Sequence, residues 1–242
     1  MLTAGFWGLV GGVALLVGAV LGLRVGGSSR AIGVVMAFGV GVLVSALAFD
    51  LAEEAFRSGG GIPVVLGLLA GAGTFFAGDA VLDRHGGNHR KRSGGQQAGG
   101  NAGAIVLGSL LDGIPESVAI GVSLLGGGAV GLPVVAAVFL SNVPESLSAA
   151  TGLRKAGHSA RWILGLWTTV ALVSALAAAV GYAALGHASP VVIAVIQAFA
   201  AGAILTMLAD TMMPEAFEHA GSSVGVVTSL GFTLAFLLSQ AE

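Results

Sequence analysis

The stretch 110–117 reads LLDGIPES, and the stretch 140–146 reads LSNVPES. Each contains a Pro-Glu-Ser unit near the middle of a long run of apolar residues. Such runs recur from one end of the chain to the other, since 55% of the residues are hydrophobic, 9% are charged and the mean hydropathy is +0.95. A soluble domain carries about 25% charged residues, so lipid must be the solvent for most of this chain.

Eight of the apolar runs are each long enough, at roughly 20 residues, to cross a hydrocarbon core of about 30 Å as a helix. Continuous runs rich in Leu, Ala, Val and Gly favour helices over the short alternating strands of a membrane barrel. We therefore predict an all-α polytopic membrane protein with one transmembrane domain over 1–242. The predicted spans are 5–23, 31–52, 62–82, 103–125, 130–152, 161–185, 190–213 and 222–239.

The basic residues predict the orientation, because short cytoplasmic loops hold most of the Lys and Arg of a membrane protein. All except Arg57 fall in the loops after the first, third and fifth spans, which share one side: Arg24, Arg30, Arg84, Arg90, Lys91, Arg92, Arg154, Lys155 and Arg161. We therefore expect both termini outside, in the plasma membrane or bacterial inner membrane. The stretch 1–23 has no basic residue ahead of its apolar run, which favours a retained first span over a cleaved signal peptide.

The second and seventh spans predict an internal repeat. Without gaps, 38–56 aligns with 199–217, and the two segments share Phe, Gly and Leu positions and a Glu-Ala-Phe. An odd number of crossings separates them, so equivalent residues face opposite sides, which is typical of an inverted-topology repeat. Spans 1–3 and 6–8 would then form a pair around spans 4 and 5, in a 3+2+3 arrangement. Chance similarity between two Gly/Ala/Leu-rich helices is the alternative.

The longest predicted loop, 83–101, is rich in Gly, Gln and charge, and His85 and His89 stand beside its basic run. This composition is typical of a disordered cytoplasmic loop that faces lipid headgroups. The histidines allow a second interpretation, in which the loop collects metal ions weakly.

Polar side chains of the fourth and fifth spans are predicted to converge. Asp112 and Glu116 are four residues apart and share a helical face, as do Ser141, Asn142 and Glu145. Neither span contains Lys or Arg, so we expect a bound cation or protonation to neutralise these carboxylates, which would otherwise be costly in a bilayer. The alternative is a pair of protonated glutamates that are hydrogen-bonded across the helix interface.

These motifs, together with a seventh span that ends in Pro214-Glu215, resemble the ZIP family of metal transporters. The family's fourth and fifth spans typically carry His-Asn-x-Pro-Glu-Gly and a related Asn/Asp-x-Pro-Glu-Gly. The resemblance covers essentially the whole chain. It implies uptake of a divalent cation toward the cytoplasm by alternating access, with Zn²⁺ favoured and Mn²⁺, Fe²⁺ and Cd²⁺ as other candidates. The expected metal ligands are Asp112, Glu116, Asn142, Glu145 and Ser141.

Four positions depart from the family pattern. Asp112 stands where the family usually has His, Gly113 where it often has Asn, and Asn142 where some members have Asp. In the sixth span, Ala178 stands where members often carry a glutamate. The missing ligands at Gly113 and Ala178 predict one principal metal ion. An all-oxygen site suits harder ions such as Mn²⁺, although carboxylates bind Zn²⁺ as well.

Other acids lie toward the predicted helix ends. Asp50, Glu53 and Glu54 end the second span at the outer face and could attract cations to an entrance. An exit would use residues that lie toward the cytoplasm: Asp210, Glu215, His219, His85 and His89, with Asp79, Asp83 and Glu218 beside them. For each residue singly, a solvated helix end is the simpler interpretation.

The sequence also limits the other classes of function. Nothing resembles a P-loop, no cysteine could supply a thiolate, and a net charge of −2 does not favour nucleic acid. We expect the protein to be neither an enzyme nor dependent on a cofactor. Its expected partners are the metal substrate and the lipid bilayer, and a homodimer is possible. A metal-sensing relative that does not transport is the alternative. An intramembrane hydrolase is a weaker one, because 53–57 and 77–79 match protease motifs incompletely.

Overall fold

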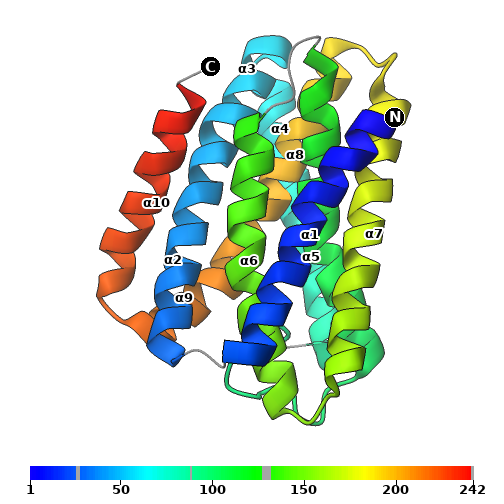
Figure 1. Ribbon diagram of the computed structural model, residues 1–242. Helices are drawn as coiled ribbons and strands as arrows, with labels where there is room; N and C mark the ends of the chain where they lie inside the picture. The colour runs from blue at the N-terminus through cyan, green and yellow to red at the C-terminus, as the bar shows by residue number, and fades with distance from the viewer. Residues whose placement is uncertain (26–27, 88, 127–131, 241–242) are drawn as a thin grey trace.

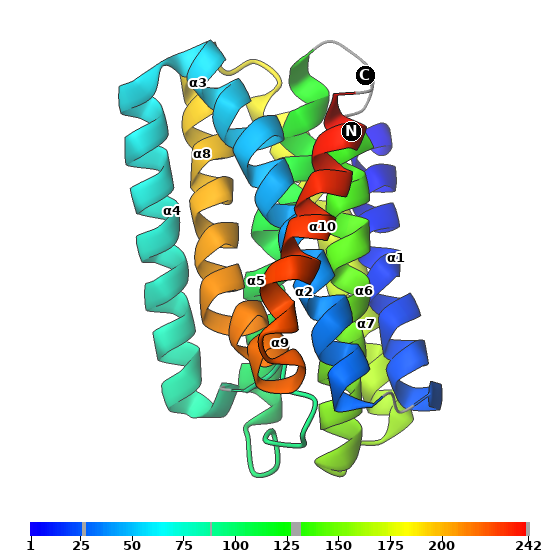
Figure 2. The same ribbon diagram turned by 90° about the vertical axis from the view of Figure 1, so that its left-hand side faces the viewer.

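The computed structural model describes residues 1–25, 28–87, 89–126 and 132–240, and within these ranges every regular element is helical. The helices form one elongated bundle (Figures 1 and 2). They are α1 (Leu2–Val25), α2 (Ser29–Ala46), α3 (Glu53–Gly59), α4 (Gly61–Leu82), α5 (Ala102–Ser123), α6 (Leu132–Lys155), α7 (Ala160–Leu185), α8 (Pro190–Met207), α9 (Met213–Ala220) and α10 (Ser223–Ser239). Residues 127–131, which are part of the predicted loop before the fifth span and the first two residues of that span, lie outside the described residues.

Seven helical segments of the described chain are long and apolar enough to cross a membrane, which confirms a polytopic all-α protein. The eighth predicted span corresponds to α10, a shorter apolar helix of 17 residues. The second and seventh spans run furthest past their predicted ends, to Gly59 and to Ala220. The seventh span is predicted to end just before Pro214. In the structure a π-helical turn at Leu208–Met212 precedes this proline, and the chain continues as the helix α9. Such turns absorb an irregular step in the hydrogen-bond ladder.

The two aligned segments of sequence have matching local structure. Helices α2 and α8 each have 18 residues, and each is followed by a π-helical turn and then by a short helix. Both also begin in the same way, since the hydroxyl of Ser28 accepts a hydrogen bond from Ala31 N and that of Ser189 accepts one from Val192 N. The likeness of the sequences therefore extends to capping and to the position of the helix irregularity.

The neighbours of α2 and α8 also correspond. α2 packs against α10, and α8 packs against α4. A Cβ on Gly231 of α10 would overlap the carbonyl of Phe38, and a Cβ on Gly71 of α4 would overlap the carbonyl of Phe199, the residue that aligns with Phe38. Both pairs of helices thus depend on backbone contact that only glycine permits.

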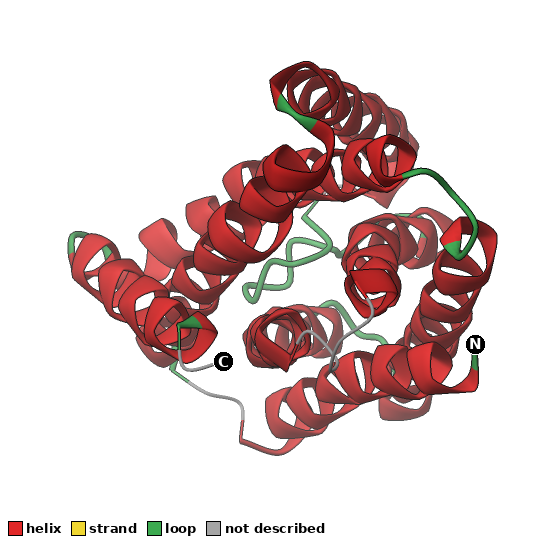
Figure 3. Ribbon diagram, turned by 90° about the horizontal axis from the view of Figure 1, so that it is seen from above, coloured by secondary structure: helices red, strands yellow, loops and turns green. Residues whose placement is uncertain are grey.

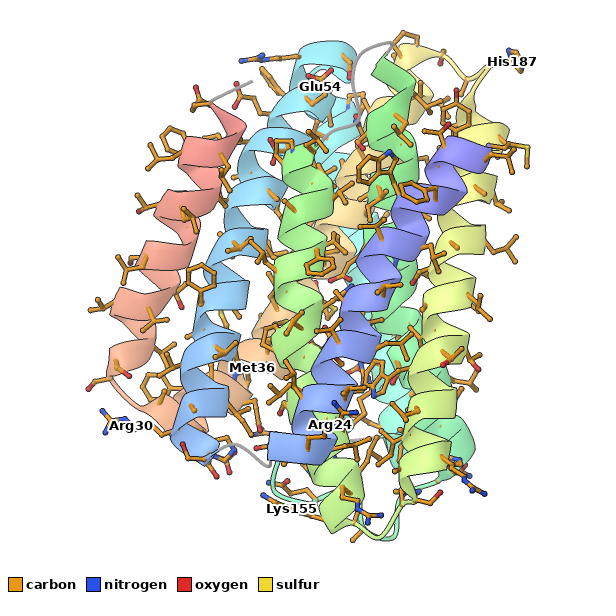
Figure 4. All side chains as sticks on the ribbon, in the orientation of Figure 1. Arg24, Arg30, Met36, Glu54, Lys155 and His187 are labelled. Carbon is orange, nitrogen blue, oxygen red and sulfur yellow. The ribbon has the colours of Figure 1, made fainter. Side chains whose placement is uncertain are left out.

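The two ends of the bundle differ in charge. Arg24, Arg30 and Lys155 lie at one end, whereas Glu54 and His187 lie at the other (Figure 4). Leu2 and Ser239, the outer residues of α1 and α10, lie at the same end as Glu54 (Figure 1). This distribution agrees with the segregation of basic residues in the sequence, because basic residues gather at the end away from these terminal helix residues.

We predict that Gly71→Val destabilises the protein much more than Gly73→Val, although both lie in α4. The first side chain would meet the Phe199 backbone, whereas nothing lies within 4 Å of a Cβ at Gly73. Overpacking of this kind costs about 1–3 kcal/mol. Thermal unfolding in detergent would measure the difference, and equal melting temperatures for the two variants would contradict the observed contact between α4 and α8.

Candidate functional site

The predicted ligands lie on α5 and α6, and all of them are buried. Asp112 and Glu116 occupy the middle of α5, and Glu145 the middle of α6. Each of these carboxylates is at most 3% exposed. Ser141 and Asn142 are buried one turn before Glu145. The structure therefore brings the oxygen-bearing side chains of the two Pro-Glu-Ser helices into the interior of the bundle.

The polar neighbours on α6 are oriented by their own hydrogen bonds. Asn142 Nδ2 donates to the carbonyl of Gly11 on α1 at 3.0 Å, and Ser141 Oγ donates to the carbonyl of Val138 at 3.0 Å. With its amide nitrogen engaged by Gly11, Asn142 has its side-chain oxygen left as an acceptor. Ser141 keeps its lone pairs in the same way.

Glu116 differs from the other two acids. Its Oε1 is buried and has no hydrogen-bond partner among the described residues, and its carboxylate forms no ion pair there. A buried oxygen without a partner is costly, and such exceptions usually indicate a functional role or an absent ligand.

Asp112 and Glu145 are paired with cations from the segment 89–101, which connects α4 to α5. Lys91 Nζ lies 3.5 Å from Asp112 Oδ2 and 3.1 Å from Glu145 Oε2, the second contact being an ion pair without hydrogen-bond alignment. The Arg90 guanidinium donates to both oxygens of Asp112 at 2.8 Å and lies 2.6 Å from Asp79 Oδ1. A single ammonium therefore connects α5 to α6, and a single guanidinium connects α5 to α4.

Arg90 stays charged although it is buried. Burial lowers the pKa of its guanidinium, but the carboxylates of Asp112 and Asp79 raise that pKa more, so that it lies above its ordinary value. A bidentate pair between a guanidinium and a carboxylate is among the strongest side-chain contacts in proteins.

The same segment also engages the predicted exit. Arg92 forms ion pairs with Glu215 and Glu218 of α9, at 3.3 Å for Glu215. The backbone N–H of Ser93 donates to Glu215 Oε1 at 2.8 Å, and Ser93 Oγ lies 2.9 Å from His219 Nε2. Glu215 and His219 are thus held by the loop.

These contacts correct two expectations. The interpretation of 83–101 as a disordered loop that faces headgroups was wrong, because Arg90, Lys91, Ser93 and Gln97 are buried against the helices. The expectation that only a bound cation or protonation could neutralise the acids was also wrong, because the chain supplies Arg90 and Lys91 itself. Both errors came from treating loop and spans separately. The signal was present as three successive basic residues beside spans with acids and no cation.

Two of the three predicted entrance residues lie around a cavity of about 390 Å³ at the predicted outer end of the bundle. Asp50 and Glu54 line this cavity, whereas Glu53 forms an exposed ion pair with Arg57 at 2.5 Å. Gln197 also lines the cavity, and its buried Oε1 has no hydrogen-bond partner among the described residues. The sequence analysis did not single out Gln197, because one amide in an apolar helix carries no distinctive pattern.

A smaller cavity of about 180 Å³ lies beside the basic segment. Asp79, Asp83, Asp210 and His89 contribute to its wall, together with Arg90 and its two successors. His85 does not reach it, because its exposed ring contacts the carbonyl of Val81. Within the described residues no three His, Asp or Glu side chains are gathered closely enough to hold a metal ion as they stand.

In a comparison with protein families, residues 83–239 match the family model described as ZIP Zinc transporter. The matched region is more than half of the chain and contains α5, α6, α8 and α9 with the basic segment. A comparison with individual curated proteins gives no match.

We predict that Arg90→Met lowers the free energy of unfolding by about 3 kcal/mol, the low end of the range for breaking a buried pair, because Lys91 remains beside Asp112. The control is Arg57→Met, which breaks an exposed pair and should cost about 1 kcal/mol or less. Unfolding by SDS in mixed micelles without metal would measure both. Equal effects would mean that the Arg90 pairs do not persist in solution.

Proposed function

Because this chain belongs to the ZIP zinc transporter family, it is a multi-pass membrane protein that transports metal ions, and we propose that its cargo passes through the carboxylates of α5 and α6. We further propose that the cargo is a divalent transition-metal cation taken up toward the cytoplasm. The members of this family are transporters rather than enzymes. Zn²⁺ is favoured by the family, and an all-oxygen site also admits Mn²⁺, Fe²⁺ and Cd²⁺.

The observation that carries this proposal is the unpartnered oxygen of Glu116 beside two further buried acids. Asp112, Glu116 and Glu145 would provide the charged ligands, with the side-chain oxygens of Asn142 and Ser141 completing the shell. A carboxylate without a cation partner, deep in an apolar bundle, is the group whose charge an incoming metal would balance.

The two cavities support a path through this site. The outer cavity, with Asp50 and Glu54, lies at the end of the bundle away from the basic loops, and would receive hydrated cations from outside (Figure 4). The inner cavity, with Asp79, Asp83 and Asp210, would receive the ion on its way to the cytoplasm. The acids of α5 and α6 would bind the ion as it passes from the outer cavity to the inner cavity.

Alternating access between these cavities would come from the paired halves of the chain. We propose that α1–α4 and α7–α10 are inverted repeats around α5 and α6, with both termini outside the plasma membrane. The matched caps and π-helical turns of α2 and α8, and the equivalent contacts of Phe38 and Phe199, support this arrangement. Inverted repeats allow one structure to open to either side by exchanging the conformations of its halves.

The decisive experiment compares the parent chain with Glu116→Gln in proteoliposomes supplied with Zn²⁺, Mn²⁺, Fe²⁺ or Cd²⁺. This change keeps the shape of the side chain and leaves no cation unpaired, since Glu116 forms no ion pair among the described residues. We expect uptake to fall at least about 10-fold, because even groups behind the ligands of a metal site change affinity or activity by 10- to 100-fold.

Glu53→Gln is the matched control, because it removes one carboxylate from an exposed pair outside the path and should leave uptake near the parent level. Normal uptake by Glu116→Gln would remove Glu116 from the site. No uptake of any ion by a folded parent would favour a metal-sensing relative that does not transport.

A further inference from the structure

Three successive basic residues of one loop enter the space between the helices. The segment 89–101 lies at the lower end of the bundle in Figure 2, and the view along the bundle axis shows loop within the outline of the helices (Figure 3). Arg90 and Lys91 are each 3% exposed, less than is usual for basic residues. Their charges meet the acids to which the metal site is assigned.

The backbone of this segment is held by dedicated partners on the neighbouring elements. Ser148 Oγ of α6 donates to the carbonyl of Lys91 at 2.6 Å, and Lys155 Nζ donates to the carbonyl of Ser93 at 2.9 Å. Within the segment itself, Gln97 Nε2 donates to the carbonyl of Arg92 at 2.5 Å. Backbone groups in the interior need such partners, so the bundle has a formed socket for 90–93.

Two glycines make room for this socket. A Cβ on Gly152 of α6 would overlap the carbonyl oxygen of Arg92, and a Cβ on Gly108 of α5 would lie 2.5 Å from Arg90 Cδ. By contrast, nothing lies within 4 Å of a Cβ on Gly165 of α7. Gly152 and Gly108 therefore leave the space that the segment fills, whereas Gly165 faces no neighbour among the described residues.

Lys91 and a metal ion would compete for the same oxygens. The ammonium of Lys91 lies between Asp112 and Glu145, the two acids that a metal would have to bridge to bind α5 and α6 together. Carboxylate oxygens bind zinc at about 2.0–2.2 Å. A divalent ion bound between Asp112 and Glu145 would therefore lie close to the buried Lys91 ammonium, and the low dielectric constant of the interior strengthens the repulsion between the two charges. Mutual repulsion excludes the two cations from one site.

We propose that 90–93 is a tethered counter-cation, which occupies the transport carboxylates when no metal is bound and leaves when metal binds. This inference rests on the proposed function and adds Lys91 and Arg90 to the residues that determine it. A divalent ion that arrives from the outer cavity replaces Lys91 between Asp112 and Glu145. The freed segment then withdraws from Glu215 and opens the inner end. After the ion has left, the segment returns to the acids.

This arrangement makes Lys91 a specificity residue. A monovalent cation brings no more charge than the ammonium it would displace, and it would also have to break the contacts that Ser148 and Lys155 make with the segment. A divalent cation brings twice the charge to the same carboxylates. Docking of the segment therefore raises the metal concentration needed for half-maximal uptake and favours divalent ions over monovalent ones.

The first test uses the absence of cysteine from the chain, which allows single-cysteine labelling without background. Ser93→Cys places a thiol in the buried socket, and Gln96→Cys places one on the exposed side of the same loop. We expect a maleimide to label Ser93→Cys slowly without metal and several-fold faster with saturating Zn²⁺ or Mn²⁺. Labelling of Gln96→Cys should not accelerate. Coordination of Zn²⁺ by the thiol would slow labelling, so it cannot imitate the expected result.

The second test displaces the segment without removing any charge. Gly152→Ala should make Ser93→Cys react rapidly without metal, and should lower the metal concentration for half-maximal uptake by roughly 10- to 100-fold, according to how strongly docking is favoured. Lys91→Met should act in the same direction, and Gly165→Ala should leave both readouts unchanged. A merely structural defect would reduce the maximal rate without lowering the half-saturating concentration.

The outcomes separate the two proposals. If the parent takes up metal and Glu116→Gln does not, but metal leaves Ser93→Cys labelling unchanged and Gly152→Ala leaves half-saturation unchanged, the counter-cation is refuted and transport stands. If the parent takes up no ion but metal still accelerates labelling of Ser93→Cys, transport is refuted and the counter-cation stands. If neither uptake nor acceleration is seen, both proposals are refuted.

Discussion

The compensation of buried negative charge is the constraint on which the rest of this structure depends. Asp112, Glu116 and Glu145 lie in the interior of an apolar bundle, where an isolated carboxylate costs several kcal/mol. Two of them are balanced by Arg90 and Lys91, and this balance requires the segment after α4 to fold back between the helices. The glycines on α5 and α6 and the partners of the segment's carbonyls follow from the same requirement, because a folded-back loop needs both space and hydrogen bonds.

Charge balance also connects the centre of the bundle to one of its ends. The segment whose Arg90 and Lys91 pair with Asp112 and Glu145 also contacts Glu215 on α9 through Arg92 and Ser93, so one short stretch of chain holds both the central acids and α9. Among the described residues, no ion pair joins the central acids to the opposite end of the bundle, and the cavity there is larger than the one beside the basic segment. For the proposed uptake, a filled centre, a held end and a hollow opposite end suit a transporter that receives its ion from the side of the larger cavity.

The helical spans could be predicted because their cause is local. Each span needs roughly 20 apolar residues to cross the lipid, and these residues are consecutive in the sequence. The convergence of Asp112 with Glu145 was also predictable, since a spacing of four residues determines the shared face of each helix. The position of Lys91 was not, because its partners are distant in sequence and depend on Gly152 and Ser148, which by themselves look like ordinary small residues of a membrane helix. Composition alone made 83–101 resemble a disordered loop.

One departure of this chain from the family pattern, Asp112 in place of the usual His, has a physical reason in the contact with the basic segment. A histidine at position 112, as the family usually has, could not accept both N–H groups of the Arg90 guanidinium, because an imidazole offers at most one acceptor. Asp112 accepts both at 2.8 Å. The Asp112 carboxylate and the Arg90 guanidinium therefore form one ion pair, in which each charge lowers the free-energy cost of burying the other. Changing either alone leaves a buried charge, so the two residues have to be considered together.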